Sequence, residues 1–352
     1  MKRPLIIAAT VAAAFGLLQV PAAATPEPGL TWQLSPTGSE ARLRGLAAVS
    51  HRVAWASGSG GAVLRTTDAG QTWQRSTPPG AETLQLRDIE AFDADNAVAL
   101  SIGPGEDSRI YRTTDGGATW SETFRNTEPT AFYDCMAFFD RRHGLALSDP
   151  VDGKFRVLST GDGGATWSVL PSDGMPAALE GEFAFAASGQ CVSVAGGRDA
   201  WISTGGGAKA RVLHSADRGH TWAAVDTVLA GGPSAGVYAT AWRDTKRGIA
   251  VGGDFAAPTN GVDALGLTRD AGQTWTKPAN APNGYRSGVA WHPFVRSGAI
   301  AVGPTGSDVT FDGGRTWKQF DAGTFDTVDC ARDGACWASG ATGRVGILRL
   351  TT

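Results

Sequence analysis

Nine polar side chains lie near the beginnings of six of seven short β-like stretches, and their types suit a pocket that binds or hydrolyses a ligand. Three are arginines, three are tyrosines and three are carboxylic acids. The set is Arg44, Arg87, Asp88, Tyr133, Asp134, Glu182, Tyr238, Tyr285 and Arg286. Arginines can hold a substrate carboxylate, a tyrosine beside a glutamate can act as a nucleophile, and an aspartate can act as acid and base. These residue types are the ones that hydrolysis of an acidic glycoside would need.

The alternative interpretation is that these residues are solvated side chains where strands begin. The stretches align as "RLRGLAAV", "LQLRDIEAF", "AFYDCMAF", "GEFAFAAS", "GVYATAW", "GYRSGVAW" and "FDTVDCA". In the last stretch, Asp326 occupies the corresponding position. If the seven stretches converge on one axis, their first residues form a mixed-charge concave pocket that binds a ligand. We predict ligand binding there and assign no catalytic residue.

A repeated string provides the elements that would position this pocket. The pattern Ser/Thr-x-Asp-x-Gly-x-Thr-Trp occurs six times, from "TTDAGQTW" to "TFDGGRTW". Its aspartates are Asp68, Asp115, Asp162, Asp217, Asp270 and Asp312, at successive spacings of 47, 47, 55, 53 and 42 residues. Aspartate accepts hydrogen bonds from turn N–H groups, glycine permits positive φ, and tryptophan buries a large ring. The strings therefore predict structural hairpin turns.

The spacing predicts an all-β fold, a seven-bladed β-propeller with four-stranded antiparallel blades. The C-terminal "CWASGATGRVGILRLTT" stops where another aspartate is due, and "TPEPGLTWQLS" near the N-terminus is a degraded copy with Glu27 in place of aspartate. We therefore expect an N-terminal outer strand to join the C-terminal blade and close the ring. A six-bladed ring with a loose tail is the alternative.

The ends and the composition limit the possible partners. Residues 1–24 have the basic start, apolar run and small residues of a signal peptide, which leaves residues 25–352 as one propeller domain in the periplasm or outside the cell. The formal net charge of −3 would become −5 without Lys2 and Arg3, which argues against nucleic acid. We expect no cofactor, no metal and no membrane insertion after signal removal, and a monomer that binds a protein or a glycan.

The repeated string is the Asp-box, or BNR repeat, which occurs in sialidases and in many secreted propellers with WD40/YVTN-like blades. With one copy per blade, the chain most resembles the photosystem II stability/assembly factor family, and residues 132–167 resemble its bacterial relatives. The resemblance implies an exported, non-enzymatic scaffold for a protein partner. A sialidase-like hydrolase or a glycan-binding module is the alternative, although the Arg-Ile-Pro motif of sialidases is absent. A glycan would use exposed aromatic residues such as Trp201 and Tyr238.

Loops and cysteines give two further predictions. The loops after the second strands are expected to be long in blades 2–5, including residues 195–210 in blade 4, so that the ligand-binding face is lopsided. In "VDCARDGACWAS", Cys330 and Cys336 would lie opposite each other across a hairpin and form a disulfide. Cys135 and Cys191 fall in adjacent blades and are predicted to form the second one.

Overall fold

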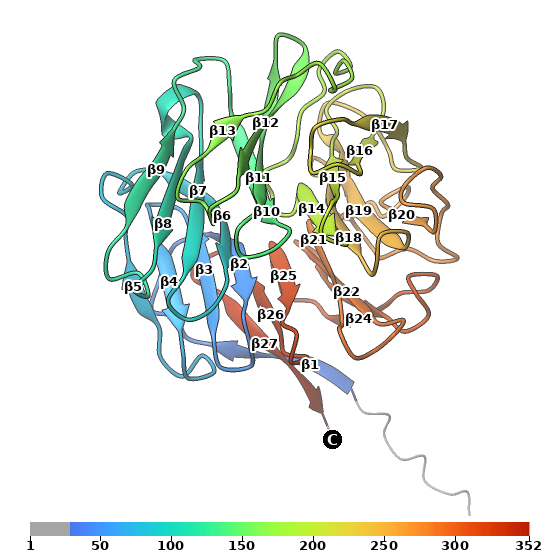
Figure 1. Ribbon diagram of the computed structural model, residues 1–352. Helices are drawn as coiled ribbons and strands as arrows, with labels where there is room; N and C mark the ends of the chain where they lie inside the picture. Colours follow the sequence, from blue (N-terminus) through green and yellow to red (C-terminus); the bar gives the residue numbers. More distant parts are fainter. Residues whose placement is uncertain (1–28, 352) are drawn as a thin grey trace, which may run out of the picture.

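The chain folds into seven antiparallel sheets arranged in a ring, as the spacing of the repeats predicts (Figure 1). The structure is a computed structural model and describes residues 29–351. The predicted signal peptide and Glu27 lie outside these residues. Six sheets have four strands. We number the sheets along the chain as blades 1 to 7. Blade 5 has three strands, and an isolated bridge between Leu267 and Thr276 takes the place of its outer strand.

Each blade runs from an inner strand at the channel to an outer strand at the rim. The inner strands are β2 (Leu43–Ala48), β6 (Gln85–Ala91), β10 (Tyr133–Phe138), β14 (Val192–Ala195), β18 (Ala235–Trp242), β21 (Gly288–Trp291) and β25 (Thr327–Cys330). The second strands are β3 (Ala54–Gly58), β7 (Ala97–Ile102), β11 (Gly144–Val151), β15 (Asp199–Ser203), β19 (Gly248–Asp254), β22 (Ala299–Gly303) and β26 (Cys336–Ser339). The third strands are β4 (Val63–Thr66), β8 (Arg109–Thr113), β12 (Lys154–Thr160), β16 (Arg211–Ser215), β20 (Leu265–Thr268), β23 (Gly306–Thr310) and β27 (Val345–Thr351). The outer strands are β5 (Gln74–Ser76), β9 (Ser121–Arg125), β13 (Ser168–Val169), β17 (Ala223–Asp226), β24 (Lys318–Asp321) and β1 (Gly29–Ser35), and a short 3-10 helix, η1 (Gly105–Asp107), lies between β7 and β8.

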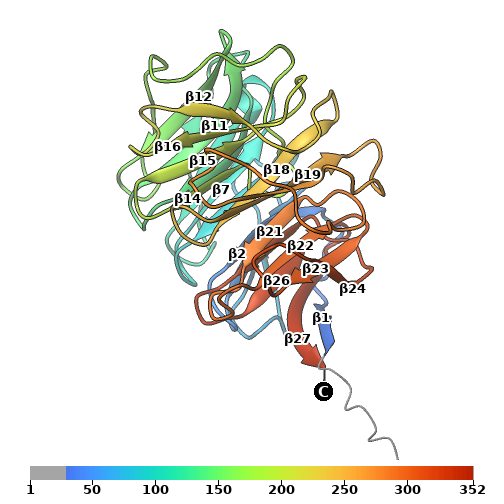
Figure 2. The same ribbon diagram turned by 90° about the vertical axis from the view of Figure 1, so that its right-hand side faces the viewer.

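The N-terminal strand closes the ring, as predicted. β1 pairs antiparallel with β27 from Gly29 opposite Thr351 to Ser35 opposite Val345, and Figure 2 shows the two strands together at the seam. Trp32 donates a hydrogen bond to Ser307 of blade 6 at 2.9 Å, and Ser35 accepts one from Trp73 of blade 1 at 2.8 Å. β1 therefore joins three blades, because its side chains reach both neighbours of the sheet that it completes.

The core lies between adjacent blades. Trp55 and Trp120, from blades 1 and 2, meet edge to face with ring centres 6.3 Å apart, and Trp73 and Trp337 do the same at 6.1 Å between blades 1 and 7. Such offset aromatic pairs add to the free energy gained by burying the rings. Among residues 29–351, no helix is long and apolar enough to cross a membrane.

The six aspartate turns share one hydrogen-bond pattern. In the first, Asp68 accepts from the Thr72 backbone N–H at 2.9 Å and from its hydroxyl at 2.6 Å, and from the Thr66 hydroxyl at 2.9 Å. The Gly70 N–H donates to Thr66 Oγ1 at 2.9 Å. The same bonds recur around Asp115, Asp162, Asp217, Asp270 and Asp312. The bonds from Thr72 lower the pKa of Asp68 to about 2.

Blade 4 departs from the predicted alignment. Residues 181–188 were expected to form its inner strand, but that strand is β14, which begins at Val192. The region assigned to a long loop contains the second strand, β15, with Trp201 in it. The prediction that Trp201 is exposed is therefore wrong: it is fully buried and stacks on Trp242 at 3.7 Å between ring centres. An irregular segment precedes β14, so the first two strands of the blade lie later in the sequence than the alignment predicts.

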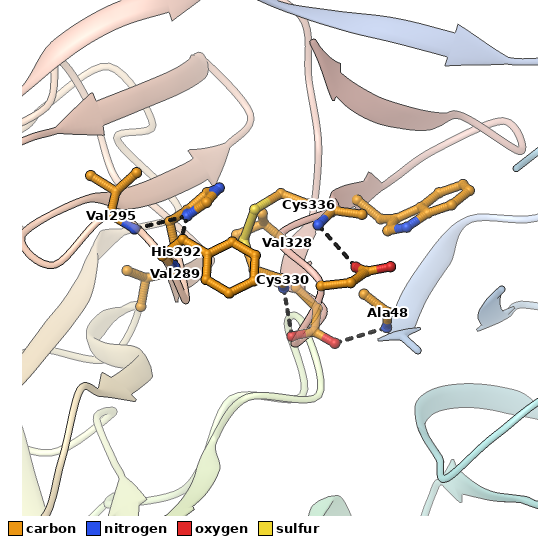
Figure 3. Close-up of a disulfide and its surroundings, with 12 residues drawn as sticks. Ala48, Val289, His292, Val295, Val328, Cys330 and Cys336 are labelled. Atoms are coloured by element: carbon orange, nitrogen blue, oxygen red, sulfur yellow. Dashed lines mark hydrogen bonds between the residues drawn. A yellow bond between two sulfur atoms is a disulfide. The ribbon is translucent and has the colours of Figure 1, made fainter. Parts of the chain in front are cut away.

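Both predicted disulfides are present. Cys135 of β10 bonds to Cys191, the residue before β14, and so links blades 3 and 4. Cys330 and Cys336 lie opposite each other on β25 and β26, with Cα atoms 4.0 Å apart. Figure 3 shows this disulfide beside Val328 and Val289 of the inner strands. The Cys330–Cys336 disulfide links the first two strands of the blade that is assembled from both ends of the chain.

Candidate functional site

An irregular segment from blade 4 crosses the central channel. We call residues 183–190 the channel segment. The Ala186 carbonyl accepts hydrogen bonds from Arg44 of blade 1 at 3.4 Å and from Arg87 of blade 2 at 2.9 Å. A side chain on Gly189 would lie 2.5 Å from Asp88 of blade 2, and φ at this glycine is +73°. The segment therefore reaches the opposite side of the ring, and its close approach requires glycine.

Gln190 fastens the end of the channel segment to two more blades. Its amide nitrogen donates to Val328 O at 3.0 Å and to Val289 O at 3.3 Å, and its oxygen accepts from Val289 N–H at 3.0 Å. The next residue, Cys191, is held by its disulfide to β10. The channel segment thus divides the channel into an upper mouth, where the inner strands begin, and a lower chamber, where they end.

Arginines gather at the upper mouth around one carboxylate. Asp326 accepts two hydrogen bonds from Arg42, at 2.8 and 2.7 Å, and Arg44 Nε lies 3.9 Å from it. Arg87 makes no ion pair within residues 29–351. Burial, followed by the charges of Arg44 and Arg42, lowers the pKa of Arg87 to about 10. The mouth therefore carries more positive than negative charge.

Aromatic rings form a wall beside these arginines. Phe185 of the channel segment stacks on Tyr238 with ring centres 4.2 Å apart, and Tyr238 stacks on Tyr285 at 5.2 Å. The Tyr238 hydroxyl donates to the Ser234 carbonyl at 2.9 Å. Burial raises the pKa of Tyr285, as does the charge of Asp326, which places this ring next to the arginine group. The exposed ring of Phe255 meets Phe185 edge to face at 6.3 Å.

Two carboxyl groups lie beneath the start of the channel segment. Asp149 accepts a hydrogen bond from Ala184 N–H at 2.8 Å, while Asp134 is 2 % exposed. Burial raises the pKa of Asp149 to about 6, and burial together with the Asp149 charge raises that of Asp134. Two adjacent buried carboxyl groups cannot both ionise cheaply, so the ionisation of one opposes the ionisation of the other.

Six of the nine predicted site residues are buried. Glu182 forms a buried ion pair with Arg211 at 2.5 and 2.8 Å and also accepts from Thr204 at 2.6 Å. Arg286 is 1 % exposed and pairs with Asp308 at 2.7 and 2.5 Å. The six buried residues are Asp88, Tyr133, Asp134, Glu182, Tyr238 and Arg286. The three arginines expected to hold one carboxylate are thus divided between the mouth and a buried pair.

The sequence alignment missed two parts of the upper mouth. Arg42 precedes Arg44 by two residues, just before β2 begins, and both side chains reach Asp326. Phe185 was assigned to an inner strand, and its place in the channel follows only from the irregular path of the channel segment. The resulting site is the upper mouth of a seven-bladed propeller, lined by arginines and stacked aromatic rings.

Comparisons with known proteins agree on the fold. No protein-family model and no curated protein matches the chain. Among solved structures, YCF48 bound to D1 peptide matches with a TM-score of 0.63 and 14 % identity over 91 % of this chain and 97 % of that one. YCF48 from Cyanidioschyzon merolae matches with a TM-score of 0.62 and 18 % identity over 91 % and 98 %. The GH74 xyloglucanase from Xanthomonas campestris matches with 0.62 and 15 % over 90 % of this chain and 53 % of that one. At these identities the likeness concerns the fold alone.

Proposed function

We propose that this chain is an exported, non-enzymatic propeller that binds a carboxylate-bearing segment of a protein partner at its upper mouth. Arg87 carries the proposal. Its guanidinium is half-buried, its hydrogen bond goes to the neutral carbonyl of Ala186, and it has no carboxylate partner among the described residues. The Asp326 carboxylate already accepts hydrogen bonds from Arg42 and lies 3.9 Å from Arg44 Nε. A ligand carboxylate would balance the positive charge of Arg87 and could accept two parallel N–H hydrogen bonds from its guanidinium.

The surroundings of Arg87 suit a peptide. The half-buried ring of Tyr285 and the exposed ring of Phe255 offer apolar surface for a side chain next to the carboxylate. Phe185 and Tyr238 are buried themselves and hold these two rings by aromatic packing. One protein of the same fold has been solved with a bound peptide. The two disulfides and the signal-like residues 1–24 support export, because disulfides persist in oxidising compartments.

The hydrolase alternative has less support from the geometry. Its nucleophile pair would need Tyr285 beside Glu182, yet both oxygens of Glu182 are bonded to Arg211 and other partners. Its third arginine, Arg286, is bonded to Asp308. The aromatic residues proposed for stacking on a glycan, Trp201 and Tyr238, are both buried.

Peptide binding can be tested by fluorescence anisotropy on the mature protein. The probe is a labelled twelve-residue peptide of glutamate, leucine and alanine, and its control has glutamine at each glutamate. We expect the acidic peptide alone to bind and Arg87→Met to weaken it about tenfold or more, since hydrogen bonds between charged groups contribute about 1.5–3 kcal/mol. Arg75→Met, at an exposed arginine on β5, is the matched control. Equal binding of both peptides, or equal losses in both variants, would refute the proposal.

A further inference from the structure

The lower chamber is a second cavity in the channel, on the other side of the channel segment from the arginines. Its volume is about 290 Å³. Its polar lining comprises Asp88, Glu90, Ser188, Gln190, Ser193, Thr240 and Asp329. Within the described chain, no lysine or arginine lines it. The two ends of the channel are therefore lined by different groups, arginines at the upper mouth and carboxyl groups in the lower chamber.

Three residues with carboxyl groups line this chamber, and one of these groups has no hydrogen-bond partner in the described part of the chain. Asp88 accepts from Met136 N–H at 2.6 Å. Asp329 accepts from Ala48 N–H and Cys330 N–H, both at 2.8 Å, as Figure 3 shows near the disulfide. Glu90 follows Asp88 by two positions on β6 and so faces the same side. It makes no hydrogen bond or ion pair to any residue in the range 29–351. Glu90 is thus the carboxyl group free to receive a ligand.

A second, independent feature of the chamber is an unused hydroxyl in the channel segment. Ser188 lines the cavity and is 2 % exposed, and its Oγ has no hydrogen-bond partner in the described part of the chain. A buried hydroxyl without a partner costs free energy, which a ligand donor would recover. Gln190 beside it cannot supply that bond, because its amide is already bonded to Val289 and Val328.

The remaining walls are apolar and aromatic. Phe138, Trp242 and Trp291 line the chamber at the ends of three inner strands, and the Trp291 indole N–H is bonded to Ala241 O at 3.1 Å. Indole and phenyl rings accept both alkyl chains and cations against their faces. The described residues contain no group of three or more side chains placed to hold a metal ion. Carboxyl groups, an unpaired hydroxyl and aromatic walls in one chamber favour an organic cation as its ligand.

We propose that the lower chamber binds a primary ammonium group at the end of an alkyl chain, with Glu90 as its charge partner and Ser188 as a hydrogen-bond acceptor. The alkyl chain packs along Trp242 and Trp291. The free ligand is a linear diamine; a lysine side chain of a polypeptide presents the same chemistry. Burial, with the charges of Asp88 and Asp329, raises the pKa of Glu90, so an arriving ammonium displaces a proton from it.

Isothermal titration calorimetry of the folded protein with 1,5-diaminopentane tests this site. We expect saturable binding at one site, no binding of the neutral isostere 1,5-pentanediol, and proton release visible as a dependence on buffer ionisation enthalpy. Glu90→Gln should weaken diamine binding about tenfold or more. Glu82→Gln is the matched control, because Glu82 is exposed and forms no ion pair in the described structure. Thermal melts of both variants check that they fold.

The outcomes separate this site from the upper mouth. Glu90→Gln should weaken diamine binding and leave binding of the acidic peptide at the upper mouth unchanged. Binding of Nα-acetyl-lysine amide as tight as that of the diamine would assign the site to a polypeptide side chain, and binding of the diamine alone would assign it to a free amine. Absence of diamine binding, equal binding of pentanediol, an unaffected Glu90→Gln variant, or calcium binding in place of the diamine would each overturn the proposal.

Discussion

Replacing Gln190 by alanine tests whether the channel segment is fastened to the far side of the ring. The substitution removes three hydrogen bonds, to Val289 N–H, Val289 O and Val328 O, at 3.0, 3.3 and 3.0 Å. Each bond contributes about 0.5–1.5 kcal/mol net, and an unpaired buried N–H costs about 1–3 kcal/mol. Water that enters from the lower chamber can form some of the lost hydrogen bonds and so reduce the loss of stability. We therefore expect Gln190→Ala to lower the free energy of unfolding by about 2–4 kcal/mol.

Urea denaturation followed by tryptophan fluorescence measures the loss, and hydrogen exchange locates it. Amides of residues 183–190 should exchange about tenfold faster for each 1.4 kcal/mol of local stability lost. Gln71→Ala is the control, since Gln71 makes one bond, to Asp68 O at 3.1 Å, on an exposed turn. That variant should change stability by less than about 0.5 kcal/mol. Equal stability losses in the two variants, or unchanged exchange in the channel segment, would refute the reasoning.

Three further predictions concern the scaffold. Replacing Cys135 and Cys191 with alanine should destabilise the protein by about 4 kcal/mol, and replacing Cys330 and Cys336 by about 2 kcal/mol, because the two disulfides close loops of 56 and 6 residues. The reverse order in urea denaturation would contradict the loop-length argument. Thermal melts should show stability rising as the pH falls from about 6 to about 4, because folded Asp149 keeps a proton that the unfolded chain releases. Below about pH 4, stability should fall as turn aspartates such as Asp68 are protonated, and a steady decline from pH 7 downward would show this account to be wrong. Glu182→Ala should lower the free energy of unfolding by about 3–5 kcal/mol, because it leaves Arg211 buried without its partner. Adding Arg211→Met should restore part of that stability. No recovery in the double variant would mean that the broken ion pair is not the cause of the loss.

The sequence by itself determined the ring and the way in which it closes. The aspartate turns are local, because Asp68 bonds only to residues within four positions of it, so a short string is enough to specify each one. Their spacing then counts the blades, and the degraded copy around Trp32 identifies the strand that joins the C-terminal blade. The Cys330–Cys336 hairpin is local in the same sense, since six residues separate the two cysteines.

Only the tertiary structure decided which predicted polar residues meet. Arg44 and Arg286 occupy similar places in their repeats, but Arg286 is paired with Asp308, whereas Arg44 lies at the mouth near Asp326, 282 positions away in the sequence. The channel segment has no periodic pattern, and its path depends on long-range bonds from Ala186 and Gln190 to other blades. Side chains at equivalent repeat positions differ in burial and charge because their partners come from elsewhere in the ring, and the repeat carries no information about those partners.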